Sequence, residues 1–380
     1  MKCRKCGSEN AGIANFCAKC GASLSAGSIL DQPNAGAGNL TGGFQSQLDA
    51  TKASIDAEIA RFTSTGFGTG RLGDGGGAKA PIHPMELLGL IMPLPDQILQ
   101  SKNIALSSPF IHANAQYHAR IEKTSFRYLP KDMTVNAFAT DFAVPIGEEE
   151  TLDPPAIAFL GGLAMVLRLA SAALAAFMRP RSELRLLGGE SSLLKAFQGI
   201  GNAILTGGGK IDPESMEAVF KETILPELDE DDDRFTGLAH SLSAAMEAAV
   251  IAHEAGHLSL GHTLGRRLNF DVSRNQEREA DSFASSVLSS SPFREYLFLG
   301  QIFVTIIFSW IDYASRKSDP STHPLGRERF FNAMTSNSAA AREAASQFGL
   351  TRERLIELLP ADDAQSLNLR FLQVPDLLHP

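Results

Sequence analysis

The chain has 380 residues, of which 44% are hydrophobic, so it can bury a sizeable core without disulfide or metal staples. Its formal net charge of -9 and pI near 5.5 exclude a concentrated basic surface, so nucleic acid is not an expected partner. No apolar leader segment follows the opening residues Met1–Cys6, which predicts a cytoplasmic location.

All four cysteines lie within the first 20 residues, in two Cys-x-x-Cys pairs. Cys3 and Cys6 form the first pair, and Cys17 and Cys20 form the second. Two such thiolate turns can enclose one tetrahedral zinc ion, and a reducing compartment disfavours the alternative of two disulfides. Residues 1–24 therefore resemble the small zinc ribbons that open many bacterial proteins. A closed shell of four thiolates predicts a structural zinc or a docking element for a protein partner.

Residues 25–80 are rich in glycine, alanine and serine, which predicts a flexible linker. One segment interrupts it, because Gln47–Phe62 spaces its apolar residues as a short amphipathic helix does. Such a helix would dock on the main domain or on a partner. The main domain is expected over 81–347, followed by a C-terminal helix and tail over 348–380.

Within the main domain, β-branched and aromatic residues predict a strand over Met133–Thr140. The apolar run Ala156–Met178 contains Arg168 near its centre, which favours a buried helix over a membrane span. Tyr296–Ile311 falls just short of the ~17–25 residues needed to cross a bilayer. We expect it to be a core helix, with membrane association as the alternative. Residues 179–240 form an insertion, and its glycine-rich stretch Leu205–Gly209 predicts a mobile loop over the active site.

Two histidines four residues apart flank a glutamate in the stretch His253–His257, HEAGH. On a helix the two imidazoles lie about 40° apart around the axis and one turn displaced, so both can reach one metal ion. Glu254 then faces the open side of that metal, where it can take a proton from an activated water. The alanine-rich run Ala244–Ile251 predicts that the motif lies on a buried helix.

An acidic segment of helical pattern begins 20 residues after His257. Its members Glu277 and Asp281 are four residues apart and share a helix face, so one can ligate the metal while the other supports a ligand histidine. Two histidines and one carboxylate leave a fourth coordination position open, as in catalytic zinc sites. Glu279 and His262 are the alternative third ligands. His262 fits less well because it lies about 140° around the helix from His257.

Three ordered stretches carry a resemblance to a known family: HEAGHLSLGH (His253–His262), EREADSFA (Glu277–Ala284) and STHPLGRER (Ser321–Arg329). They are similar to the successive signatures of the zinc endopeptidases that include HtpX and the CAAX prenyl proteases. The resemblance covers about 134–330. It implies a gluzincin-type α+β domain, predominantly helical with a small sheet, that cleaves proteins or peptides. Membrane members of the family have clear spans before the metal motif, which this chain lacks.

Residue by residue, the resemblance implies His253, His257 and Glu277 as the ligands of a catalytic zinc. Glu254 would be the general base and acid, and Asp281 would support a ligand histidine.

By the same analogy, His323 would steady the oxyanion of the tetrahedral intermediate, and Arg329 would either assist it or fix the site through an ion pair. Pro324 favours an extended conformation at His323, and a surface-loop histidine is the alternative reading. Asn136, Ala137, Phe138 and Ala139 would form the edge strand that pairs with extended substrate.

The sequence therefore predicts a zinc-dependent endopeptidase. The first rival is a non-catalytic adaptor that keeps the metallopeptidase fold and acts by binding through its zinc ribbon. The second is a membrane-associated quality-control protease, which differs in location more than in chemistry.

Overall fold

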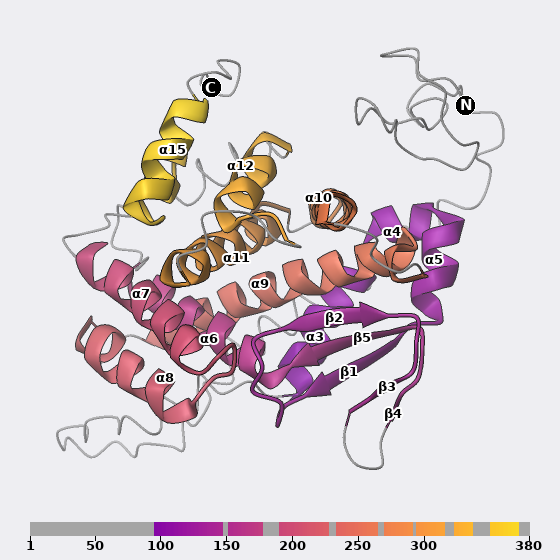
Figure 1. Ribbon diagram of the computed structural model, residues 1–380, viewed down its shortest axis with the longest axis horizontal. Helices are drawn as coiled ribbons and strands as arrows, with labels where there is room; N and C mark the ends of the chain where they lie inside the picture. Colours follow the sequence, from indigo (N-terminus) through magenta and orange to yellow (C-terminus); the bar gives the residue numbers. More distant parts are fainter. Residues whose placement is uncertain are drawn as a thin grey trace. The chain divides into compact units, whose positions relative to one another are not determined.

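The computed structural model describes residues 95–146, 151–177, 190–227, 233–264, 270–291, 294–315, 323–336 and 350–371. All of them belong to one compact unit, 74–380. Helices dominate this unit, and a small sheet lies along one side of it (Figure 1). The predicted α+β class, predominantly helical with a small sheet, is confirmed.

The α-helices are α3 (Pro95–Leu106), α4 (Pro109–Ala113), α5 (Ala115–Glu122), α6 (Gly161–Phe177), α7 (Glu190–Thr206), α8 (Pro213–Val219), α9 (Asp233–Ser259), α10 (Phe270–Ser289), α11 (Arg294–Ala314), α12 (Gly326–Ser336), α14 (Arg352–Glu357) and α15 (Ala361–Phe371). A π-helical turn, η2 (Phe220–Ile224), and two 3₁₀ turns, η3 (Leu225–Glu227) and η4 (His262–Leu264), complete the helical elements among the described residues.

The main sheet has three strands in the order β1-β5-β2. The central strand β5 (Ala156–Leu160) pairs parallel with β1 (Ser125–Leu129) and antiparallel with β2 (Ala137–Thr140). β2 is therefore an edge strand, and it lies beside α9 (Figure 1). A separate two-stranded sheet joins β3 (Val144–Pro145) to β4 (Thr151–Leu152).

The 27-residue helix α9 forms the centre of the domain. It packs against α3, α6, α10 and α11, and apolar side chains from all of these helices form one continuous core. One charged pair is buried in this core. Arg168 of α6 lies 3.2 Å from Glu247 of α9, which also accepts hydrogen bonds from Ser101 and Ser243. Burial of a charge is tolerated here because the opposite charge and two hydroxyls satisfy it.

The prediction of one buried helix over Ala156–Met178 is wrong in its first part. Ala156–Leu160 is the central strand β5, and the helix begins at Gly161. All five residues of β5 are buried, so the strand is a continuous apolar run without alternation. Such a run cannot be told from a buried helix by periodicity alone. The predicted strand over Met133–Thr140 is regular only from Ala137.

The apolar segment Tyr296–Ile311 belongs to the 21-residue helix α11 and is therefore longer than the sequence predicts. By length and composition α11 could cross a membrane, and it is the one such helix in the described part of the chain. Within the protein, 72% of its most apolar window is buried, as in a core helix. The C-terminal region contains two helices, α14 and α15, where the sequence predicts one.

Candidate active site

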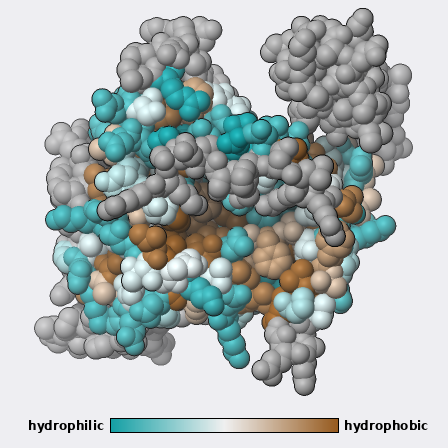
Figure 2. Space-filling view, in the orientation of Figure 1, coloured by the Kyte–Doolittle hydropathy of each residue, from teal (hydrophilic) through white to brown (hydrophobic). Residues whose placement is uncertain are grey.

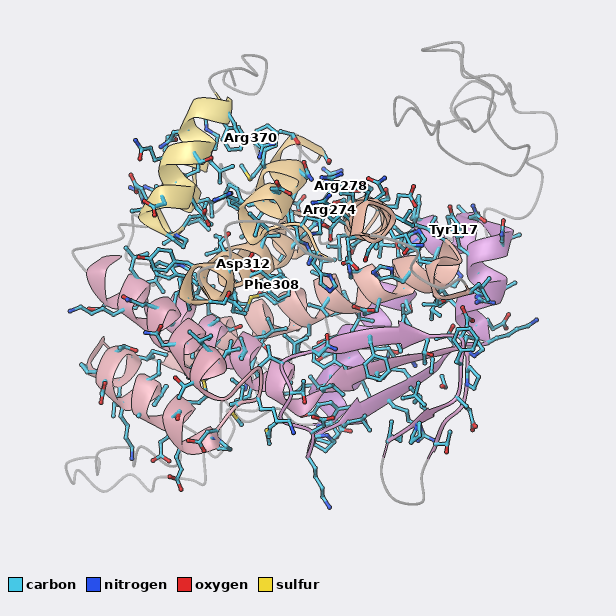
Figure 3. All side chains as sticks on the ribbon, in the orientation of Figure 1. Tyr117, Arg274, Arg278, Phe308, Asp312 and Arg370 are labelled. Atoms are coloured by element: carbon cyan, nitrogen blue, oxygen red, sulfur yellow. The ribbon has the colours of Figure 1, made fainter. Side chains whose placement is uncertain are left out.

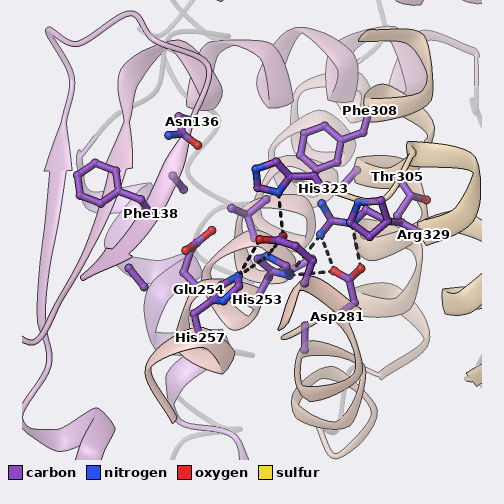
Figure 4. Close-up of a pocket in the computed structure, with 18 of the residues that line it drawn as sticks. Asn136, Phe138, His253, Glu254, His257, Asp281, Thr305, Phe308, His323 and Arg329 are labelled. Atoms are coloured by element: carbon purple, nitrogen blue, oxygen red, sulfur yellow. Dashed lines mark hydrogen bonds and ion pairs between the residues drawn. The ribbon is translucent and has the colours of Figure 1, made fainter. Parts of the chain in front are cut away.

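Helix α9 presents the two histidines and the glutamate of the HEAGH stretch to one cavity (Figure 4). His253, Glu254 and His257 are each less than 9% exposed. The Nε2 atoms of His253 and His257 lie 3.1 Å apart, because one helical turn separates them. The predicted convergence of the two imidazoles is therefore present.

Helix α10 brings a carboxylate to the same point. Glu277 Oε2 lies 3.3 Å from His253 Nε2, and Glu277 Oε1 lies 3.5 Å from His257 Nε2. One atom from each of these three residues lies within 4.8 Å of the others, and this is the one such group of three ligands among the described residues. Glu279, the alternative ligand on the same helix, contacts His262 and not this cluster.

Asp281, one turn beyond Glu277, contacts the far side of His253. Its Oδ1 lies 2.9 Å from Nδ1 of His253. A proton on Nδ1 that is donated to Asp281 leaves Nε2 facing Glu277. The guanidinium of Arg329 donates to both oxygens of Asp281, with Nε 3.0 Å from Oδ2. Arg329 therefore holds Asp281, and Asp281 holds His253.

His257 has a polar partner of its own, His262, which lies behind it as one interpretation of a histidine at the end of the helix expects. Its Nδ1 lies 3.1 Å from Nδ1 of His262, and Nε2 of His262 lies 2.9 Å from Oε2 of Glu279. Gly261, with φ of 75°, ends the helix and turns the chain so that His262 folds back over His257. Such a chain of contacts can fix which nitrogen of His257 carries the proton.

His323 approaches the cluster from the segment before α12. Its Nδ1 lies 3.0 Å from Glu277 Oε2, while 56% of its side chain is exposed. It thus combines a contact to the cluster with access to the cavity, where Figure 4 shows its ring facing the space between β2 and α11.

The groups of the cluster differ in the charge that their surroundings favour. Burial lowers the pKa of His257 to about 4, so this imidazole is neutral at pH 7. Burial also opposes the charged form of His253, but hydrogen bonds to Asp281 and Glu277 outweigh it and raise the pKa of His253 to about 9. For Glu277, hydrogen bonds from three histidines outweigh burial and hold its pKa well below the usual range.

Glu254 lies beside the cluster, with its carboxyl group turned toward β2 (Figure 4). Burial raises the pKa of Glu254 to about 7, although the charge of His253 and a hydrogen bond from the backbone N–H of Ala139 oppose this rise. A carboxyl group with a pKa near neutrality can both accept and return a proton at pH 7.

The cavity has a volume of about 870 Å³ and extends beyond the ligand cluster. In Figure 4, Asn136, just before β2, and Phe138 of β2 lie on one side, and Thr305 and Phe308 of α11 lie on the other. Figure 3 shows Phe308 and Asp312 along α11. Apolar residues gather across the middle of this face of the molecule (Figure 2). The apolar lining comes mainly from α6, α7, α9 and α11: Leu163, Ile204, Ala249, Val250, Val304, Phe308 and Ile311.

The site residues predicted in the main domain all line this cavity. They are Asn136, Ala137, Phe138, Ala139, His253, Glu254, His257, Glu277, Asp281, His323 and Arg329. The four cysteines and the predicted helix over Gln47–Phe62 lie outside the described residues.

Two family models match the sequence. Residues 216–349 match Peptidase U49, and residues 2–24 match a zinc-ribbon domain. The chain carries a peptidase domain. The first match contains His253, His257, Glu277 and His323, and the second contains the four cysteines. No curated protein and no solved structure matches the chain. The matches support a peptidase with a zinc ribbon, without assigning it to the HtpX or CAAX prenyl proteases.

Proposed function

We propose that this chain is a zinc-dependent endopeptidase, with protein or peptide substrates. The observation that carries the proposal is the meeting of His253, His257 and Glu277 from two helices, next to a buried glutamate and an open cavity. We also propose that the chain is related to the family of zinc endopeptidases that includes HtpX and the CAAX prenyl proteases.

The donor set fits zinc. Two imidazole nitrogens and a carboxylate are ligands that zinc accepts, and three protein ligands leave a position for water or substrate. Lone pairs of Nε2 atoms 3.1 Å apart, beside a carboxylate, repel one another unless a cation or a proton lies between them. When bound, zinc supplies a Lewis acid that polarises the scissile carbonyl and activates water for attack.

The chain's own residues would move the protons and hold the reacting groups. Glu254 accepts a proton from the attacking water and returns it to the leaving amine. His323 donates a hydrogen bond to the oxyanion, since its exposed ring lies at the edge of the cluster. Arg329 acts through Asp281, which holds His253 in one orientation.

Strand β2 would bind the substrate backbone. In the antiparallel pairing with β5, the carbonyl of Asn136 accepts a hydrogen bond from the N–H of Leu160. The backbone groups of Phe138 therefore also point toward β5, while those of Ala137 and Ala139 point toward the outer edge. That edge borders the cavity. An extended peptide can add to it as a further strand, next to Glu254. The apolar cavity lining favours an apolar side chain beside the scissile bond.

The test is hydrolysis of an unfolded protein by the wild type and by Glu254→Gln, with zinc content measured on both. Glutamine has nearly the same shape but cannot take a proton, so we expect the rate to fall by about 10²–10⁴-fold with zinc retained. Equal activity in the two proteins would refute the mechanism.

The non-catalytic adaptor predicts a different result, namely two zinc ions per chain and no hydrolysis by the wild type. The zinc ribbon would then hold one ion through Cys3, Cys6, Cys17 and Cys20, and act as a docking element in either case. A cytoplasmic location is part of the proposal. Partition of the whole chain into detergent, with α11 released from the core, would instead support the membrane-associated protease.

A further inference from the structure

The segment between α7 and α8 occupies the same edge of the sheet that a substrate would use. The Val135 N–H donates to the carbonyl of Gly209 at 2.9 Å, and the Ile211 N–H donates to the carbonyl of Met133 at 2.8 Å. Thr134 and Lys210 form an antiparallel bridge between these two bonds. Residues 209–211 therefore pair with 133–135, immediately before β2.

This pairing lies on the outer side of the sheet. On the inner side, the carbonyl of Asp132 accepts from Gly162 and the carbonyl of Asn136 accepts from Leu160, both from the β5 and α6 side. The backbone groups that bond to 209–211 belong to Met133 and Val135. These residues alternate along the chain with Asp132 and Asn136, so their backbone groups point to the opposite side. Gly209 and Ile204 also line the catalytic cavity together with Ala137 and Ala139. The segment thus borders the same cavity as the proposed substrate strand, and a bend at Val135, where the N–H of Asn136 donates to the carbonyl of Thr134, separates it from β2.

We infer that the turn Gly207–Lys210 closes the cleft on the side that receives substrate residues after the scissile bond. This inference rests on the proposed pairing of substrate with β2. A substrate antiparallel to β2 runs from Thr140 toward Asn136, so its C-terminal part approaches Gly209. The backbone N–H of Ala139 faces Glu254, which places the reacting bond near Ala139.

The space between that point and the turn is short. Gly209 lies opposite Val135, so the three strand positions opposite Phe138, Ala137 and Asn136 remain before the chain of the turn is met. At about 3.3 Å per residue, this leaves room for about three extended residues after the scissile bond. Longer substrates must bend away from the edge. Beyond the other end of β2, Phe142 lines the cavity and is 62% exposed.

The enzyme should therefore select bonds by their position in the substrate more than by the neighbouring side chains. A bond close to the substrate's C-terminus, or just before a sharp turn, has few extended residues after it and can be accommodated. An extended segment that continues beyond about three residues loses its pairing with β2 or displaces the turn.

The experiment uses N-acetylated, C-amidated peptides with a central Ala–Leu bond, a constant N-terminal part, and one to six residues after the bond. With the zinc-loaded full chain, we expect kcat/KM to fall about tenfold or more between three and five residues after the bond. Binding of the same peptides to Glu254→Gln, measured by fluorescence anisotropy, should weaken over the same interval. Equal rates and equal affinities for short and long peptides would overturn the inference.

The turn itself is tested by Gly209→Val. Gly209 has φ of 89°, which a β-branched residue does not adopt, so the turn must move away from Val135. We expect the difference between short and long peptides to shrink in this variant. Gly208→Asn is the matched control, because asparagine tolerates the φ of 62° at Gly208 and should keep the length limit.

The two proposals fail in different ways. If the wild type hydrolyses no peptide of the series while Glu254→Gln still binds short ones better than long ones, the endopeptidase proposal fails and the inference on the turn stands. If both chains handle every length alike, the inference fails and hydrolysis by the wild type still supports the endopeptidase.

Discussion

At the scale of residues, the carboxyl and imidazole groups of the site differ in their burial and in the charged groups that they contact. Glu254 is buried beside like and unlike charges, and its pKa is raised to about 7. His257 is neutral because it is buried, and His253 is stabilised in its charged form by two carboxylates. These three neighbours on one helix therefore ionise in different pH ranges, and Glu254 has a pKa suited to a general base at neutral pH.

The raised pKa of Glu254 predicts an acid limb in the activity. Only the ionised carboxylate can accept a proton, and its fraction grows as the pH rises through about 7. A bound cation would move this limb to lower pH because it favours the ionised form. We expect kcat/KM to rise with pH from 5 to 7.5, measured on a short peptide with zinc in excess. A rate that is higher at pH 5 than at pH 7.5 would contradict Glu254 as the base.

The contact from His257 to His262 predicts an effect on metal affinity. Removing a polar partner of a ligand histidine typically weakens metal binding by about 10–100-fold. We expect this loss for His262→Asn, and a smaller loss for Glu279→Gln, in competition with a coloured zinc chelator. His112→Asn, in helix α4, is the control. Unchanged zinc affinity in His262→Asn would mean that His262 only packs against His257.

At the scale of elements, the position of α9 against its neighbours decides whether the site forms. Gly256 on α9 faces α10, where a Cβ atom would lie 3.1 Å from Cα of Ala280. Gly300 on α11 faces α9, where a Cβ atom would lie 2.4 Å from the backbone of Ala245. These close approaches bring the helices of the ligand cluster together and leave no room for a larger residue.

Gly300→Ala should therefore destabilise the domain. The added methyl group must push α9 and α11 apart, and overpacking of this kind costs about 1–3 kcal/mol. Gly237→Ala is the matched control. A Cβ atom at this helical position of α9 meets nothing within 4 Å, so alanine should stabilise by about 0.5–1 kcal/mol. Urea unfolding measures both. Equal effects of the two substitutions would show that the α9–α11 contact is not tight.

The candidate ligands could be predicted from the sequence because the spacing within a single helix decides which residues share a face. His253 and His257 share a face through the period of one helix, and Glu277 and Asp281 share a face through the period of another. The pairing of His262 with His257 could not be predicted in this way, since it depends on the turn at Gly261. The strand β5 was missed because a fully buried strand carries no alternation.

At the scale of the whole molecule, residues of the insertion 179–240 and of the central helices α9 and α11 line the same cleft. The turn after α7 pairs with the segment before β2, and Ile204 of α7 lines the cavity. The sequence predicted an insertion near the active site, but not which edge of the sheet it would meet. Pairing between segments about 75 residues apart is set by the tertiary fold and leaves no periodic signal.

Metal binding should couple the site to the stability of the whole domain. A ligand that binds only the folded chain stabilises it by about 2.7 kcal/mol at a free concentration of 100 times its Kd. Zinc would bridge α9 and α10, so removal of zinc by a chelator should lower both the activity and the unfolding temperature, and added zinc should restore them. Glu277→Ala separates this site from the zinc ribbon, because it should lose one zinc of two and most of this stabilisation.

The same coupling gives a dependence on pH with a definite sign. Without metal, the folded pKa of His253 is raised to about 9 from an unfolded value near 6.5. Its charged form therefore stabilises the metal-free chain fully below pH 6.5, and this contribution is lost as the pH rises through 9. Zinc must displace the proton on His253, so zinc affinity should rise between pH 6.5 and 9, with proton release measurable by calorimetry in two buffers. A zinc affinity that falls over this interval would show that His253 is not a ligand.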